Sequence, residues 1–139
     1  MNAKNTKKLF KRFKFFRPEL SPKESLMCFG FSCDDGWYDL IYKLCEKIEG
    51  ELKKEPNAEF NVCQVKEKFG GLRFYIDSGS TRIYKLISTA EERSYKICEK
   101  CGEGGKLRDD TGWYRTLCDE CHVKRLKNGL KSMRKMRGG

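Results

Sequence analysis

The spacing of apolar residues in the middle of the chain predicts two helices that flank a pair of strands. Between residues 37 and 52 apolar side chains recur every three or four positions, which is typical of one buried helix face. They are Trp37, Leu40, Ile41, Leu44, Cys45, Ile48 and Leu52. Asp34 or Asp35 is a natural N-cap in front of this run, and Pro56-Asn57 ends it.

The second helix is predicted after Asp77-Ser78-Gly79-Ser80 and extends to about Ile97. Ser80 or Thr81 can cap its first turn. Its apolar side is formed by Ile83, Leu86, Ile87, Ala90 and Ile97. The helix leads almost directly into Cys98, without the change in composition that marks a linker.

Between these helices, residues 60–65 and 72–76 read as two strands. Gly70-Gly71 allows the positive φ angles that a hairpin connection needs. We expect the apolar faces of both helices and of the hairpin to form one core, containing Trp37, Leu40, Leu44, Leu72, Phe74, Leu86 and Ile87.

The opposite face of the hairpin is a candidate binding surface. Arg73 and Tyr75 alternate with the apolar residues of the second strand. If Gln64 and Lys66 share their face, the hairpin offers cations and one aromatic ring, which can hold phosphates and stack a base. An ordinary half-solvated sheet is the alternative interpretation.

Residues 1–20 form either a frayed basic arm or an amphipathic helix. Leu9, Phe10, Phe13 and Phe16 fall roughly on one face. Four such residues are unusual in a disordered tail, so we expect this face to pack on the body rather than on a membrane.

Two cysteine pairs carry the clearest chemistry in the chain. Cys98 and Cys101 form one C-x-x-C pair, and Cys118 and Cys121 form another after sixteen intervening residues. This spacing predicts a tetrahedral Zn²⁺ site, with free or redox-active cysteines as the alternative. Because sulfur fills all four positions, the site is expected to be structural rather than catalytic.

The residues around these pairs predict the type of finger. Two short strands, residues 106–108 and 113–117, are separated by a turn, and helical spacing of Val123, Leu126, Leu130 and Met133 follows the second pair. This order is that of a treble-clef finger. Gly102 suits a left-handed turn after the first pair. We expect His122 to lie on the surface at the helix start, with substitution for Cys121 as a ligand the alternative.

The four other cysteines, Cys28, Cys33, Cys45 and Cys63, lack the spacing of a second knuckle and are expected to be buried free thiols. A chain of 139 residues builds only a modest core, so zinc is expected to contribute to folding. Without an export signal or a long apolar run, the expected location is the cytoplasm, and no membrane partner is expected.

The net charge of +10 is concentrated at the two ends of the chain. Residues 1–17 and residues 122–139 each hold seven basic side chains and no acid, which leaves a net charge of −4 for residues 18–121. This pattern indicates ends that contact a polyanion, with solubilising tails as the alternative. The candidate nucleic-acid-binding residues are Lys7, Lys8, Lys11, Arg12, Lys66, Arg73, Lys124, Arg125, Lys127, Lys131, Arg134 and Lys135.

Several strings resemble a family of small proteins encoded by bacteriophages and bacterial genomes. They are CDDGWYDLIYKLCEKIE, VKEKFGGLRFY, AEERSYKICEKCG and WYRTLCDECH, and the resemblance covers about residues 26–122. The family has no assigned activity. The finger is also weakly similar to that of the DksA/TraR family, which acts on bacterial RNA polymerase, but the long coiled-coil arm of that family has no counterpart here.

The sequence therefore predicts an α+β fold in three parts. Residues 1–20 form a basic arm, residues 21–97 a helix–hairpin–helix body, and residues 98–139 a treble-clef-like zinc finger with a basic C-terminal helix packed on the body. The expected function is non-catalytic binding of DNA or RNA. The alternative is a phage-derived regulator or inhibitor that binds a host protein. A third hypothesis is a metal-dependent nuclease, because Gln64-Val65-Lys66 resembles a Q-x-K endonuclease motif without an acidic partner on a neighbouring strand.

Overall fold

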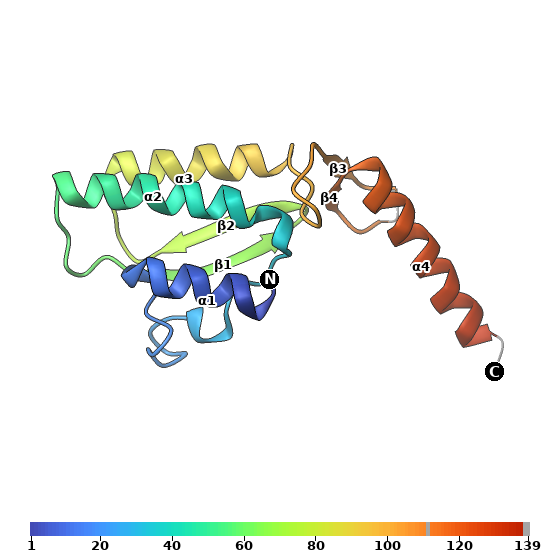
Figure 1. The fold of residues 1–139 in the computed structure, drawn as a ribbon, viewed down its shortest axis with the longest axis horizontal. Helices are drawn as coiled ribbons and strands as arrows, with labels where there is room; N and C mark the ends of the chain where they lie inside the picture. The colour runs from blue at the N-terminus through green and yellow to red at the C-terminus, as the bar shows by residue number, and fades with distance from the viewer. Residues whose placement is uncertain (111, 138–139) are drawn as a thin grey trace.

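The fold is α+β, as predicted, with four α-helices and two small antiparallel hairpins among the described residues. The computed structural model describes residues 1–110 and 112–137, with side chains described as far as Lys131. The regular elements are α1 (Ala3–Arg12), α2 (Tyr38–Lys54), β1 (Val62–Lys68), β2 (Gly71–Ile76), α3 (Thr81–Ser94), β3 (Lys106–Arg108), β4 (Arg115–Leu117) and α4 (Asp119–Arg137). Short 3₁₀ turns are η1 (Lys14–Phe16), η2 (Met27–Phe29) and η3 (Asp35–Trp37). Figure 1 shows α2 and α3 side by side along the larger hairpin, with the smaller hairpin and α4 at one end.

The turn of the larger hairpin is formed by Phe69 and Gly70, one residue earlier than the Gly-Gly connection predicted. Lys68 pairs with Gly71, and the two residues between them have φ angles of 53° and 86°. Two successive positive φ angles make the tight connection that suits strand twist. Gly71 belongs to β2, where a Cβ would lie 2.3 Å from the hydroxyl of Tyr95.

The strand register places apolar and polar residues on opposite faces, as the alternation predicted. Val65 pairs with Phe74, and both are buried. Gln64 pairs with Tyr75, and Lys66 pairs with Arg73, so these four side chains share the other face. The basic face proposed for the hairpin is therefore present, although Arg73 also donates a hydrogen bond to the Tyr95 hydroxyl at 3.2 Å.

Both edges of this two-stranded sheet are occupied. On β1, the Ser32 amide donates to the Val65 carbonyl at 3.0 Å and the Ser32 carbonyl accepts from the Glu67 amide at 2.9 Å. On β2, the Leu72 amide donates to Ser94 Oγ at 2.9 Å, and the Phe74 amide donates to a carboxylate oxygen of Glu91 at 3.0 Å. Because the edges are satisfied within the chain, they are poor templates for pairing with another molecule.

The predicted core is confirmed and is larger than expected. Trp37, Leu40, Leu44, Leu72, Phe74 and Ile87 are buried, and Leu86 packs at the margin. Leu9, Phe13 and Phe16 add three fully buried side chains from the N-terminal segment.

The N-terminal segment is a packed amphipathic helix and not a frayed arm. Phe13 lies edge-on to Tyr42 of α2, with 5.2 Å between ring centroids. Arg12 makes two hydrogen bonds to the Glu49 carboxylate, at 2.7 and 2.9 Å, which joins α1 to α2. Lys7, Lys8 and Lys11 remain exposed on the outer side of α1.

The helix caps are as predicted for α3 but not for α2. Ser80 Oγ accepts from the Ile83 amide at 3.2 Å at the start of α3. The prediction of Asp34 or Asp35 as a cap of α2 is wrong, because η3 intervenes and Trp37 occupies the cap position without a side-chain hydrogen bond. Asp35 instead accepts hydrogen bonds from the Asn2 amide and the Asn5 side chain. Desolvation raises the pKa of Asp35, but these bonds outweigh it and hold the pKa below its ordinary value.

Two of the remaining cysteines behave as expected. Cys33 and Cys45 are buried, and burial raises the pKa of Cys33 to about 12. Cys63 is half-buried, and the prediction of a buried thiol is wrong for Cys28, which is exposed. Within residues 1–110 and 112–137, none of the helices combines the length and the apolar character that crossing a bilayer requires.

Replacing Leu44 by Ala is expected to reduce the free energy of unfolding by about 2–5 kcal/mol, because it removes a side chain that is 3% exposed in the middle of the core. Denaturant titration measures the change. Glu46→Ala, an exposed position on the same helix, is the control and should change stability by less than about 0.5 kcal/mol. Equal effects of the two substitutions would contradict the assignment of the buried face.

Candidate metal centre and neighbouring surfaces

The four cysteines predicted as ligands lie together in the finger. The sulfur atoms of Cys98, Cys101, Cys118 and Cys121 all lie within 4.8 Å of one another. The separation of the Cys101 and Cys118 sulfurs is 3.7 Å. A tetrahedron with metal–sulfur bonds of about 2.3 Å has edges of about 3.8 Å. The cluster could therefore hold a metal ion without a large rearrangement.

Local backbone structure presents each pair of sulfurs. The Gly102 amide donates to the Cys98 carbonyl at 2.9 Å, and Gly102 has the positive φ of 83° that the sequence predicted. β4 leads into Cys118, and the Cys121 amide donates to the Cys118 sulfur at 3.4 Å. Since α4 begins at Asp119, the second pair is held by the first turn of a helix.

The pKa shifts of Cys98 and Cys121 are compatible with a bound cation. Burial raises the pKa of Cys98, but hydrogen bonds from the backbone of Cys118, Cys101 and Lys100 outweigh it and lower the pKa to about 7. Burial and the neighbouring thiols raise the pKa of Cys121 to about 12. One thiolate is thus favoured, while a second next to it is opposed by repulsion that a bound divalent cation removes.

His122 is not on the surface, so that expectation is wrong. The residue is 8% exposed, and its Nε2 atom lies 3.0 Å from a carboxylate oxygen of Asp110. The histidine therefore links the start of α4 to the loop after β3. His122 is not part of the four-residue ligand cluster.

The finger joins the body through a buried carboxylate. Glu99, between the first two ligand cysteines, is 2% exposed. One of its oxygens accepts from the Asp34 amide at 2.9 Å, and the other accepts from Arg115 Nε at 3.1 Å. Arg115 also donates to Asp34 Oδ2 at 2.8 Å. Desolvation raises the pKa of Glu99, and the positive charge of Arg115 opposes this rise.

Backbone contacts surround this carboxylate. The Gly36 amide donates to the Glu99 carbonyl at 2.7 Å, and Trp37 Nε1 donates to the Ile97 carbonyl at 2.9 Å. Thr116 Oγ1 donates to the Gly70 carbonyl at 2.7 Å, which ties β4 to the turn of the larger hairpin. These bonds connect residues 34–37 and 70 with residues 97–116.

The basic C-terminal helix extends away from the body (Figure 1). Its two acidic residues, Asp119 and Glu120, lie in the first turn, where negative charge favours the helix dipole. Lys124, Lys127 and Lys131 are exposed, whereas Arg125 is half-buried, with a buried NH1 that has no hydrogen-bond partner among the described residues. The side chains of Arg134 and Lys135 lie outside those that the structure describes.

An apolar stripe lies on the same helix. Val123, Leu126 and Leu130 occupy the helical spacing that the sequence predicted, and they are 47%, 37% and 59% exposed. The described part of the body does not cover these three side chains. They can therefore contact another molecule.

Three exposed aromatic side chains meet beside the finger, an arrangement that sequence reasoning missed. Phe69 comes from the β1–β2 turn, and Trp113 and Tyr114 precede β4. With Glu67 and Gly112 they line a cleft of about 310 Å³. The rings of Phe69 and Tyr114 lie edge-on, with centroids 6.3 Å apart. Aromatic residues in two separate turns were the available sequence signal, but nothing local showed that the turns meet.

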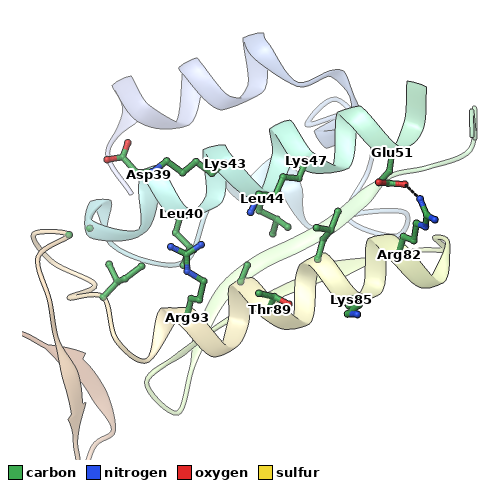
Figure 2. Close-up of a pocket in the computed structure, with 15 residues that line it drawn as sticks. Asp39, Leu40, Lys43, Leu44, Lys47, Glu51, Arg82, Lys85, Thr89 and Arg93 are labelled. Carbon is green, nitrogen blue, oxygen red and sulfur yellow. Dashed lines mark ion pairs between the residues drawn. The ribbon is translucent and has the colours of Figure 1, made fainter. Parts of the chain in front are cut away.

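A larger groove between α2 and α3 was also missed. It has a volume of about 480 Å³, and both helices supply its lining (Figure 2). The floor of the groove is apolar, and exposed lysine and arginine side chains lie along its rim. The sequence did not indicate these cations as a group, because the segment that contains them, residues 18–121, has a net charge of −4.

Replacing Gly36 by Ala is expected to destabilise the contact between finger and body, because a Cβ there would lie 2.1 Å from the Cys98 carbonyl oxygen. The close atoms belong to the backbone of Cys98 and Glu99 rather than to a flexible side chain, so little relaxation is possible and a loss of at least about 2 kcal/mol is expected in denaturant titration. Gly50→Ala is the matched control. Gly50 lies within α2 with no atom within 4 Å of the added Cβ, so this change should be neutral or stabilising by up to about 1 kcal/mol. A Gly36 variant as stable as the Gly50 variant would show that the junction is not tightly packed.

Comparisons with protein-family models, with curated proteins and with solved structures gave no match. The resemblance to small phage and bacterial proteins therefore stays a prediction, and the function has to be argued from the geometry of the chain itself.

Proposed function

We propose that this protein is a non-catalytic zinc protein that binds the phosphate backbone of nucleic acid through α4, assisted by α1. The observation that carries this proposal is the placement of α4. A helix of 19 residues begins at the cysteine cluster, extends away from the body and exposes lysines after its first turn.

Zinc is the metal that best suits the cluster. Four thiolates at tetrahedral spacing favour a soft or borderline ion, and zinc is the usual occupant of structural four-cysteine sites. All four positions are filled by protein, so a bound zinc ion would hold the loop after α3 against the start of α4. The order of knuckle, hairpin β3–β4, second pair and helix supports assignment to the treble-clef class.

Purified protein is expected to contain one zinc ion per chain, measured by elemental mass spectrometry. A Cys98→Ser and Cys118→Ser double variant should lose it, because one ligand is removed from each pair. Chelation should lower the thermal midpoint of the wild-type protein, since metal binding and finger folding are linked. The control is a Cys28→Ser variant, which changes an exposed cysteine outside the cluster and should retain zinc. Full zinc content in the double variant would contradict the site.

Electrostatics and exposure together support nucleic acid as the partner. Lys124, Lys127 and Lys131 present exposed cations along about two turns of α4. Lys124 also pairs with Glu120 at 3.4 Å, and the helix has no acid after Glu120. A helix of this kind fits the major groove of duplex DNA or lies along phosphates. Lys7, Lys8 and Lys11 of α1 offer a second set of exposed cations. The hairpin face adds Lys66 and Arg73, both half-buried, as a third set of cations.

The aromatic cleft adds a preference for unpaired bases. Phe69 keeps φ at 53°, a conformation that costs a bulky residue about 1 kcal/mol or more. Its ring is nevertheless 64% exposed, next to Tyr114 and Trp113. Exposed rings beside a basic helix suit the stacking of successive bases, which every base supports. We therefore expect single strands to bind at least as tightly as duplexes.

Affinity for nucleic acid is expected to fall steeply with salt. Five or six phosphate contacts give a slope of about −5 for log K against log salt concentration on duplex DNA. Changing Lys124, Lys127 and Lys131 to Ala should weaken binding on every sequence tested and reduce the magnitude of the slope by about 3. Fluorescence anisotropy with labelled single-stranded and duplex DNA and RNA at two salt concentrations measures both effects.

The matched control replaces three exposed lysines of the body, Lys23, Lys53 and Lys54, by Ala. The net charge changes by the same amount, so a specific role of α4 predicts a much smaller loss for the control. A dissociation constant weaker than about 10⁻⁴ M at about 0.15 M salt would be no better than weak non-specific attraction and would contradict the proposal.

A protein partner is the second candidate, and the apolar stripe of α4 favours it. Val123, Leu126 and Leu130 have the spacing of an amphipathic helix that docks in a groove. In that case the protein is a regulator, of phage origin if the resemblance holds, and α4 meets an acidic protein surface. Capture from bacterial lysate with and without nuclease separates the two, because only a protein partner is retained after digestion.

A reducing compartment such as the cytoplasm suits this function. All eight cysteines are unpaired in the structure. Thiols that must bind zinc are lost to disulfides in oxidising surroundings.

A further inference from the structure

The groove between α2 and α3 has the form of a separate binding site. Figure 2 shows α2 and α3 as its two walls, with Leu40 and Leu44 projecting from α2 toward α3. Leu86 and Ala90 of α3 and Ile97 complete the apolar lining, in which Leu86 and Ile97 are half-buried and Leu40, Leu44 and Ala90 expose only the edge of the core. The volume of about 480 Å³ lies within the range of about 300–1,000 Å³ typical of small-molecule sites.

The lining of the groove has an excess of positive charge, with five lysine and arginine side chains against the carboxylates of Asp39 and Glu51. Lys43 and Lys47 come from α2, and Lys85 and Arg93 come from α3. All four are exposed, and within the described part of the chain none forms an ion pair. Arg93 reaches from α3 toward Leu40 of α2 in Figure 2, so a cation lies over the apolar lining. Unpaired cations around an apolar surface form a complementary environment for an anion that carries an apolar body.

The ends of the groove limit what it can hold. At one end Arg82 lies 4.0 Å from the Glu51 carboxylate, joining the two helices. At the other end Gly36 of the body and Gly102 of the finger form part of the lining, so the finger borders that side. A docked helix normally continues past both ends of its groove, whereas a small ligand fits between them. The basic α4 of a second copy is also unsuited, because it would place like charges together.

We propose that this groove binds a small amphipathic anion, with a phosphate, sulfate or carboxylate group contacting Arg93 and the α2 lysines and an aliphatic or aromatic body on the leucine lining. The proposal does not depend on nucleic-acid binding by α4. Gly102, which follows Cys101 of the cysteine cluster, is the lining residue through which the groove reaches the finger.

The experiment uses the full-length protein and three probes that separate head from tail. Decyl phosphate below its micelle concentration has both parts, inorganic phosphate has only the anion, and 1-decanol has only the apolar body. Amide NMR titration gives affinity and location together. Decyl phosphate is expected to bind at least about tenfold more tightly than either partial probe, and its shifts should be confined to α2, α3 and residues 97–102.

A paired set of variants tests the rim. Lys43→Gln with Arg93→Gln removes one cation from each wall and should weaken decyl phosphate binding by about tenfold or more, since charge-assisted hydrogen bonds are lost. Lys23→Gln with Lys53→Gln removes the same charge outside the groove and should leave the affinity unchanged. A thermal melt of each variant checks folding, and the NMR map of the wild-type protein stands if the rim variant is unstable.

Four outcomes would overturn the proposal. The first is the absence of decyl phosphate binding, and the second is shifts that lie mainly outside the groove. The third is an equal affinity of the rim and control variants for decyl phosphate. An equal affinity of the wild-type protein for decyl phosphate and for one of the partial probes counts in the same way. The fourth is tighter binding of an acidic amphipathic peptide that decyl phosphate cannot displace, which would assign the groove to a partner protein instead.

Discussion

The buried carboxylate of Glu99 is the interaction on which the arrangement of the two halves depends. A carboxylate that is 2% exposed is costly unless it is paired and hydrogen-bonded. Here it receives Arg115 from the finger and the Asp34 amide from the body, and the backbone of the same residue bonds to Gly36 and Thr116. Since Glu99 lies between Cys98 and Cys101, the polar junction and the cysteine cluster share one turn of chain. Ordering the cysteines therefore also orders the contact with the body.

The junction at Glu99 also fixes where the surfaces available for binding lie relative to one another. The larger hairpin has a single apolar face, which the helices and the N-terminal aromatic residues cover, and its edges are satisfied within the chain. The body is thus complete without α4. Three of the surfaces described above lie at or reach the junction: the basic helix that starts at the cysteines, the aromatic cleft between the two turns, and the end of the α2–α3 groove at Gly102.

Charge and exposure must be considered together when function is inferred from this chain. Both ends are equally basic, yet α1 contributes Leu9 and the following residues contribute Phe13 and Phe16 to the core. Among the α4 side chains that the structure describes after His122, those at positions 123–131, none is buried. A packed helix presents its cations in a fixed pattern, while a projecting helix can enter a groove or follow phosphates. For this reason the proposed function gives α4 the leading contact and α1 an auxiliary one. The cations of the groove were not visible as an excess, because acids elsewhere in the body balance them.

The sequence by itself determined the features that depend on near neighbours. Cysteine spacing predicted the cluster, because each pair is set by a single turn. Apolar periodicity predicted α2, α3, the hairpin and most of the core, and Ser80 was found because a cap is local. Only the tertiary structure decided the rest. Asp34 accepts a hydrogen bond from Arg115, 81 positions away, and does not cap α2. His122 is buried against Asp110. Phe69 meets Tyr114, and the groove needs α2 beside α3. These features depend on contacts between distant segments, and a pattern of neighbouring residues holds no information on which segments meet.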